Sequence, residues 1–246
     1  LSDILICMSF SSLFHIQPDE VSLLLDIGSG SVGGALVVFS HNKKPSIVYT
    51  VRKDIIFQKH PDPKRLLILL TNALGAVLES VMKEGVKHLR FTRHGRGGID
   101  TVHVVLASPW YISHTKSVAV KTELPVVITE KIIDEYIHKE EQAFIDSLPA
   151  HEGQFQEGVR PVEHSVVRLL LNGYETAFPY GKHAKELCFS VYVSLMPKTI
   201  ASLIDTAIHS AFYPSCLTFH TFGLAAFTSV RSLYASTSDF IFLDVG

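Results

Sequence analysis

The chain contains the stretch Leu23–Gly34, LLLDIGSGSVGG, in which an apolar run leads into a loop of glycine and serine. Gly28, Gly30 and Gly33 keep the spacing G-x-G-x-x-G, which is found in loops that bind dinucleotides. The same residues also suit a different kind of phosphate loop. The two alternatives predict different proteins, and the residues around the loop decide between them.

The segment after the loop favours a strand rather than a helix. The dinucleotide fingerprint needs a strand, a turn and then a helix, because the pyrophosphate sits at the helix N-terminus. Residues 34–40, GALVVFS, are instead typical of a strand, and residues 41–45 form a turn before a third strand at 46–51. Asp26 also precedes the first glycine, where its carboxylate would face incoming phosphates unless a metal ion lies between them. The context therefore disfavours the dinucleotide fingerprint.

A β-hairpin phosphate loop accounts for these features. Its strand ends at Asp26, and the backbone N–H groups of its turn can cradle phosphate oxygens. We expect Gly28 and Gly30 to let phosphate approach the backbone. Ser29 and Ser31 can donate hydroxyl hydrogen bonds, and Asp26 is expected to hold Mg²⁺ through water. The alternative is a purely structural hairpin in which Asp26 forms an Asx-turn.

Bulk composition narrows the class of protein. The 246 residues include 22 basic and 24 acidic residues, so the net charge does not indicate a polyanionic partner. The sequence also lacks the stripe of aromatic and basic residues that is typical of nucleic-acid binding. The three cysteines and thirteen histidines lack zinc-ligand spacing, which favours a reduced cytoplasmic protein. No stretch reaches the roughly 18 apolar residues of a membrane-spanning helix, and the apolar residues 4–14 lack the features of a signal peptide.

Residue patterns predict further strands and helices along the chain. A helix is expected to begin at the Asp62 cap with Pro63 in its first turn and to end at Gly85, and a second helix is expected to follow the Thr129 cap. The remaining elements expected from periodicity are strands at 101–108, 116–121, 163–171 and 187–194, a turn at 172–173, and helices at 197–211 and 223–233.

The end of the chain repeats the pattern of the opening loop. FLDVG at 242–246 matches LLDIG at 24–28 in the order of apolar residues, aspartate and glycine. Two such loops near opposite ends of a two-lobed fold could grip the same phosphates from both sides. We therefore expect Asp244 and Gly246 to belong to a second phosphate loop. The chain begins without Met and stops inside this motif, as expected for a piece of a longer protein.

These motifs carry a family resemblance. DIGSGSV at 26–32, followed by a meander and a helix, resembles the first phosphate loop of the actin, heat-shock-70 and sugar-kinase superfamily, and FIFLDVG at 240–246 resembles the start of its second. The segments 102–109, 128–146 and 166–194 resemble the FtsA and PilM branch, in which an SHS2-type subdomain is inserted into the first lobe. FtsA-type loops commonly carry Lys where this chain has Ser31, so its serine-rich loop is more like that of PilM.

The resemblance implies an α/β fold in several parts. A ribonuclease-H-like, actin-type first lobe with a mixed five-stranded sheet and helices would carry a small inserted α+β subdomain of the SHS2 type, and the second lobe would be missing. The boundaries expected on this basis are a lead-in at 1–20, the two parts of the lobe at 21–98 and 197–239, the insertion at 99–196, and the first strand of the second lobe at 240–246.

The resemblance also implies a function. The chain would be part of an ATP- and Mg²⁺-binding scaffold, at most a slow ATPase, that organises a bacterial cell-division or pilus-assembly complex. Its partner would be the division-ring tubulin homologue or a pilus inner-membrane assembly protein, with self-association open, and it would act in the cytoplasm or at the inner face of the membrane. Two alternatives remain: a small-molecule kinase, for which Asp100 and Asp205 are the candidate bases, and a degenerate interaction domain without nucleotide.

Overall fold

The computed structural model describes residues 20–40, 43–56, 62–89, 98–148, 157–234 and 241. The chain forms two compact units. The first unit combines residues from both ends of the chain, 1–111 and 199–246, and the second is the continuous segment Ile112–Lys198. Each unit has its own sheet, and the two are described separately below.

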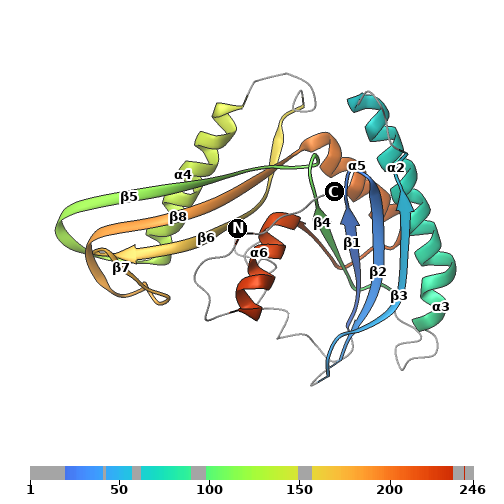
Figure 1. Ribbon diagram of the computed structural model, residues 1–246, viewed down its shortest axis with the longest axis horizontal. Helices are drawn as coiled ribbons and strands as arrows, with labels where there is room; N and C mark the ends of the chain where they lie inside the picture. The colour runs from blue at the N-terminus through green and yellow to red at the C-terminus, as the bar shows by residue number, and fades with distance from the viewer. Residues whose placement is uncertain are drawn as a thin grey trace. The chain divides into compact units, whose positions relative to one another are not determined.

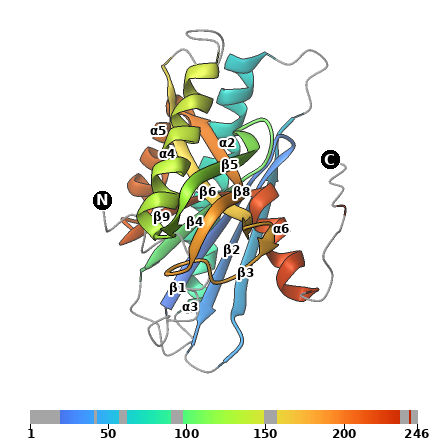
Figure 2. The same ribbon diagram turned by 90° about the vertical axis from the view of Figure 1, so that its left-hand side faces the viewer.

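The first unit is built on a mixed five-stranded sheet, as predicted. Its order is β3-β2-β1-β4-β9. The first three strands form an antiparallel meander that lies side by side in both views (Figures 1 and 2), whereas β1, β4 and β9 run parallel. The strands are β1 (Glu20–Ile27), β2 (Ser31–Phe39), β3 (Ser46–Asp54), β4 (Thr101–Leu106) and β9 (Cys216–Thr221).

Strand β4 differs from its predicted place in the chain. Residues 99–196 are predicted as the insertion, yet β4 pairs with β1 on one side and β9 on the other. Its alternate residues Val102, Val104 and Leu106 are fully buried, as a central strand of this sheet requires. The second compact unit therefore begins at Ile112 rather than at 99, and it extends to Lys198.

A long helical segment packs against β2 and β3 (Figure 1). It comprises α2 (Pro63–Ser80), the π-helical turn η2 (Val81–Gly85) and α3 (Val86–Leu89). The predicted cap is confirmed, because the Asp62 side chain accepts a hydrogen bond from the backbone N–H of Lys64 at 3.0 Å. The predicted end at Gly85 is wrong. A Cβ at Gly85 would lie 2.8 Å from Tyr49 Cδ1, so this glycine lets the helix approach the sheet closely and does not end it.

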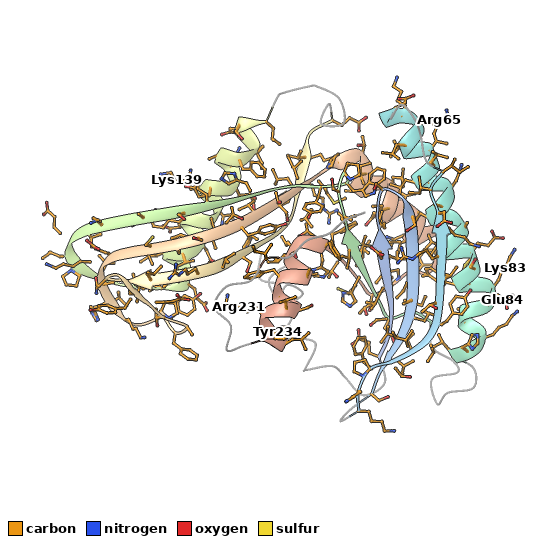
Figure 3. All side chains as sticks on the ribbon, in the orientation of Figure 1. Arg65, Lys83, Glu84, Lys139, Arg231 and Tyr234 are labelled. Carbon is orange, nitrogen blue, oxygen red and sulfur yellow. The ribbon has the colours of Figure 1, made fainter. Side chains whose placement is uncertain are left out.

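This helical segment qualifies on length and composition as a membrane span, although the sequence pattern predicts none. Lys64–Leu89 is the single such helix in the described part of the chain, with a mean hydropathy of 1.6. One such helix is weak evidence, since core helices pass the same test. One face of it is buried at Leu70, Leu74 and Val77. Figure 3 shows Lys83 and Glu84 projecting on the side away from the sheet.

The second unit is a four-stranded antiparallel sheet with one helix. The Thr129 hydroxyl caps the helix by accepting from the N–H of Ile132 at 3.3 Å, as predicted. The helix buries Ile133 and Ile137 against Phe189, Val191 and other alternate residues of the strand His183–Pro197. The sheet order is β5-β8-β6-β7, and the elements are β5 (Ile112–Val127), α4 (Glu130–Ser147), β6 (Val159–Leu171), β7 (Tyr174–Glu175) and β8 (His183–Pro197).

Two more helices follow the second unit along the chain, where the chain re-enters the first unit. α5 (Lys198–Ala211) buries Ile200, Ile204 and Ile208, which repeat every four residues and form one apolar stripe. α6 (Phe222–Leu233) follows β9 directly and packs against β4 and β9. Of the last predicted strand, 240–246, the structure describes residue 241 alone, so Asp244 and Gly246 lie outside the described residues, as does the lead-in up to residue 19.

Candidate functional site

The turn between β1 and β2 is tight and leaves backbone donors open. The N–H of Gly28 donates to the carbonyl oxygen of Ser31 at 3.0 Å, and the N–H of Ile55 donates to the carbonyl oxygen of Gly30 at 2.8 Å. The backbone N–H groups of Ser29 and Gly30 have no acceptor among the described residues. Both residues are exposed, so the turn presents two adjacent N–H donors to solvent. Successive backbone N–H groups in a turn can form an anion-binding nest.

A buried tryptophan supports the turn from behind. Trp110 is 2% exposed, and its indole Nε1–H donates to the carbonyl oxygen of Gly28 at 2.8 Å. The segment before it is tied to β1, since the N–H of Ala107 donates to the carbonyl oxygen of Ile27 at 2.9 Å. These bonds fix the position of the turn before any ligand arrives. The sequence contains one tryptophan, and nothing in its local pattern predicted this contact.

Arg52 joins the site from strand β3. Its Nη2 lies 2.8 Å from Oδ2 of Asp26, and its Nη1 donates to the hydroxyl of Ser31 at 2.7 Å. The guanidinium therefore bridges two of the residues that the sequence predicts for phosphate binding. The arginine side chain is 57% exposed and the aspartate side chain 48% exposed, so the pair faces solvent. Arg52 was not predicted as a site residue.

Gly33 makes room for that arginine. It stands opposite Arg52 in the register of β2 and β3. A Cβ at this position would lie 2.9 Å from Arg52 Nη2 and 3.2 Å from its Cζ, which is closer than side chains pack. With the dinucleotide fingerprint disfavoured, the sequence predicts only an ordinary strand position for Gly33. Its missing side chain instead allows the guanidinium to lie across the strand.

The turn and the arginine lie beside a cavity on the sheet face turned away from α2. Neighbouring strand residues point to opposite faces, and a Cβ at Gly34 would meet Val77 of α2, so Gly33 and Arg52 belong to the other face. A cavity of about 520 Å³ opens on that face. Residues of β1, β2, β3, β4 and α6 line it, among them Leu24, Asp26, Gly33, Thr50, Arg52, Val105 and Phe222.

The donors of this site fit a phosphate group better than they fit a metal ion. Two open N–H groups, the Ser31 hydroxyl and the Arg52 guanidinium are all ligands that phosphate oxygens accept from. The carboxylate of Asp26 is already paired with Arg52, and Asp54 stands opposite Ser31 in the register of β2 and β3. The described residues include no group of three or more His, Cys, Asp or Glu side chains that could hold a metal. A magnesium ion here would depend on ligand phosphates and water for the rest of its coordination.

The two candidate bases of the kinase alternative have structural contacts. Asp100 Oδ2 accepts from the backbone N–H of Val21 at 2.8 Å, and its carbonyl oxygen accepts from the N–H of Ser215 at 2.9 Å. Asp205 lies on α5, with Oδ2 3.5 Å from Nδ1 of His209 one turn later. Neither aspartate lines the cavity beside the turn. The structure therefore brings Asp26, Ser29, Gly30 and Ser31 together, but places Asp100 and Asp205 elsewhere.

A histidine pair lies on β4 and β9 of the same sheet. A hydrogen bond of 2.7 Å joins His103 Nδ1 to the hydroxyl of Thr218, and the ring of His220 lies 6.0 Å from that of His103 between centroids. Burial and, to a smaller extent, the nearby charge of His220 lower the pKa of His103 to about 4. His103 is therefore neutral at physiological pH and serves here as a hydrogen-bonding side chain of the sheet.

Comparison with solved structures gives the fold. No protein-family model matches the chain, and no curated protein matches its sequence. A structure described as the PilM-PilN type IV pilus biogenesis complex is 14% identical, with a TM-score of 0.50, over 87% of this chain and 51% of that one. A Bacteroides thetaiotaomicron protein described as having an actin-like ATPase fold and unknown function is 11% identical, with a TM-score of 0.33, over 87% of this chain and 57% of that one.

The chain thus spans about half the length of the PilM-PilN structure that it matches. At this level of identity the likeness shows the fold alone. It is a mixed α/β fold with a five-stranded mixed sheet.

Proposed function

We propose that this chain is the phosphate-binding part of an ATP-binding scaffold of the actin-like superfamily, in its FtsA and PilM branch. The observation that carries the proposal is the turn at Gly28–Gly30, which presents the open N–H groups of Ser29 and Gly30 beside Asp26, Ser31 and Arg52. On this proposal the four-stranded unit Ile112–Lys198 is the SHS2-type insertion that contacts neighbouring proteins.

Each residue of the turn has a stated role in this proposal. The N–H groups of Ser29 and Gly30 donate to phosphate oxygens, and the Ser31 hydroxyl holds the guanidinium of Arg52 in place. A Mg²⁺ ion accompanying ATP would neutralise phosphate charge, and Asp26 would hold it through water. Asp244 and Gly246 would supply the second phosphate loop. Trp110 keeps the turn in its binding geometry, so that little ordering is needed when the nucleotide arrives.

The biological role in this proposal is the one implied by the resemblance to the FtsA and PilM branch. ATP binding would set the arrangement of the lobes and thereby switch protein contacts, with hydrolysis slow or absent. The partner would be a pilus inner-membrane assembly protein in a PilM-like role, or the division-ring tubulin homologue and further copies of the protein in an FtsA-like role. The serine at position 31 and the likeness to the PilM-PilN structure favour the first of these. Either role places the protein in the cytoplasm at the inner face of the membrane.

Binding of Mg·ATP to the full-length protein, measured by calorimetry, tests the proposal. We expect saturable binding that Asp26→Ala weakens by about tenfold, since a contact to a charged group contributes roughly 1.5–3 kcal/mol. Asp205→Ala is the matched control, because it removes a paired carboxylate on α5 away from the turn, and it should bind as the wild type does. Absence of binding by the wild type would favour an interaction domain without nucleotide. ADP release that depends on a small-molecule acceptor would favour the kinase.

A further inference from the structure

Arg52 supplies the positive charge that a phosphate site needs. Its guanidinium is held at two points, by Asp26 Oδ2 at 2.8 Å and by the Ser31 hydroxyl at 2.7 Å. The missing side chain of Gly33 leaves the space in which it lies. The end of β3 is tied to the turn by the bond from the N–H of Ile55 to the carbonyl oxygen of Gly30. The arginine is therefore positioned by the fold beside the open donors of the turn.

The guanidinium still has donors to offer. An arginine side chain carries five N–H groups in a planar fork, and one bond to Asp26 and one to Ser31 use two of them. Arg52 lines the cavity beside the turn. Planar guanidinium groups bind phosphate oxygens with short, charge-assisted hydrogen bonds. Arg52 can thus hold Asp26 and a phosphate at the same time.

The pairing with Arg52 also changes what Asp26 does to an incoming anion. An unpaired carboxylate at the mouth of the turn would repel phosphate, and this repulsion was the reason to expect a metal ion there. In the structure the arginine offsets that charge within hydrogen-bonding distance. A divalent ion is then not required for phosphate to approach the turn.

We propose that Arg52 is the cation of this phosphate site, so that the turn binds a polyphosphate group without a divalent ion. This inference rests on the proposed function, because it assigns a ligand to the same turn. It differs from the simplest expectation for Asp26, in which metal is needed for binding. It also differs from a role in which Arg52 only competes with metal for Asp26. In that role Arg52 would weaken binding of the phosphate ligand, whereas an Arg52 that contacts phosphate strengthens it.

Inorganic pyrophosphate in the presence of EDTA is the probe, because it presents phosphate without adenosine and without metal. Binding to the full-length protein is measured by calorimetry. Fluorescence of Trp110 shows whether pyrophosphate binds at the turn, since its indole donates to the carbonyl oxygen of Gly28. The part of the fluorescence change that Trp110→Phe removes comes from Trp110. We expect the wild type to bind, Arg52→Gln to weaken binding by about tenfold or more, and Arg52→Lys to recover part of the loss.

Lys53→Gln is the matched control. It removes the same charge from the next residue of the same strand, but Lys53 lies near Glu79 of α2 and therefore faces the other side of the sheet. We expect its pyrophosphate binding to stay within about twofold of the wild type. Asp26→Asn gives a second measurement that does not depend on Arg52 being replaced. Removing the carboxylate should leave metal-free binding unchanged or make it tighter, because a negative charge beside the turn is lost.

The outcomes separate the two proposals. Mg·ATP binding without any pyrophosphate binding in EDTA overturns the role of Arg52 and leaves the proposed function standing. Pyrophosphate binding that Arg52→Gln does not weaken, or that Asp26→Asn abolishes, also overturns that role. Absence of both Mg·ATP and pyrophosphate binding overturns the proposed function together with this inference.

Discussion

The turn at Gly28–Gly30 and the turn at Asn172–Gly173 each join two antiparallel strands. They differ in whether their polar groups form hydrogen bonds within the described chain. In the first, two adjacent backbone N–H groups have no acceptor within the described chain. In the second, the Asn172 side-chain oxygen accepts from the N–H groups of Lys185 at 2.9 Å and Glu186 at 3.1 Å. A turn that uses its polar groups internally stabilises the fold, whereas a turn that leaves donors open can bind a ligand.

The histidine pairs of the two units differ in a similar way. His103 lies against the hydroxyl of Thr218 and the ring of His220, and burial lowers its pKa to about 4. In the second unit burial also lowers the pKa of His164, but the carboxylate of Glu141, 4.0 Å away, opposes that shift. Neither cause of the shift at His103 favours its protonated form, whereas the Glu141 carboxylate favours the protonated form of His164.

Replacing the side chain that satisfies the second turn should have the largest effect. Asn172 has a φ of 49°, in the left-handed region that asparagine tolerates better than most residues. Asn172→Ala removes two hydrogen bonds and leaves a Cβ in a strained backbone, so we expect the free energy of unfolding to fall by about 2–3 kcal/mol. Urea-induced unfolding measures this change. Pyrophosphate binding at the first turn should not change.

Two further substitutions at the same position separate the causes. Asn172→Asp keeps an oxygen that can accept both N–H groups, so it should cost less than the alanine variant. Asn172→Gly removes the hydrogen bonds but relieves the backbone strain, and its cost should fall between the two. A fully stable alanine variant would show that these bonds do not hold the turn.

Acid should destabilise the protein through its partly buried histidines. A folded-state pKa of about 4 for His103, below the ordinary value, means that its contribution to stability is complete above about pH 6.5 and is lost as the pH falls toward 4. We expect a loss of about 1–2 kcal/mol in the free energy of unfolding between pH 7 and pH 5 from this residue. The measurement is urea-induced unfolding at a series of pH values.

The histidine comparison predicts unequal effects of two variants. His103→Gln should flatten the pH dependence of unfolding between pH 7 and pH 5, since the neutral amide has no proton to gain. His164→Gln should flatten it less, because Glu141 already favours the protonated form of His164. Equal effects of the two substitutions would contradict the distinction between the two environments.

The sequence predicts the strands and the turn better than it predicts the contacts between them. Alternating and continuous apolar runs predicted the sheet around Asp26, because burial of a strand depends mainly on its own residues. The sequence predicts a helix end at Gly85, whereas the role of this glycine depends on Tyr49, which reaches it from a distant strand. Arg52 is 26 residues from Asp26, and only the register that sets it opposite Gly33 brings the two together. Such register is a tertiary property that no local pattern carries.

Adding one methyl group at Gly33 should weaken ligand binding with little effect on stability. The Cβ of Gly33→Ala would lie 2.9 Å from the flexible end of Arg52, which can move away at little cost. We expect pyrophosphate binding in EDTA to fall by about threefold to tenfold, because the guanidinium leaves its position beside the turn. Calorimetry measures this, and the free energy of unfolding should stay within about 0.5 kcal/mol of the wild type.

The adjacent glycine provides the opposite control. A Cβ at Gly34 would lie 2.8 Å from Val77 Cγ1 in the packed interface with α2. Gly34→Ala should therefore lower the free energy of unfolding by about 1–3 kcal/mol. Its effect on pyrophosphate binding, corrected for any unfolded fraction, should be small. Equal losses of binding in the two variants would argue that strand distortion, and not displacement of Arg52, is the cause.

The smallest predicted effect compares the two turns directly. No atom lies within 4 Å of a Cβ at Gly30, so Gly30→Ala should change the free energy of unfolding by less than about 0.5 kcal/mol. Gly173 has a φ of 85°, and Gly173→Ala should cost about 1 kcal/mol or more through backbone strain. We expect Gly30→Ala to weaken pyrophosphate binding by about twofold to threefold, because the methyl group limits the approach of phosphate to the N–H of Gly30. Unchanged binding would place the phosphate away from this N–H and restrict the site to Ser31 and Arg52.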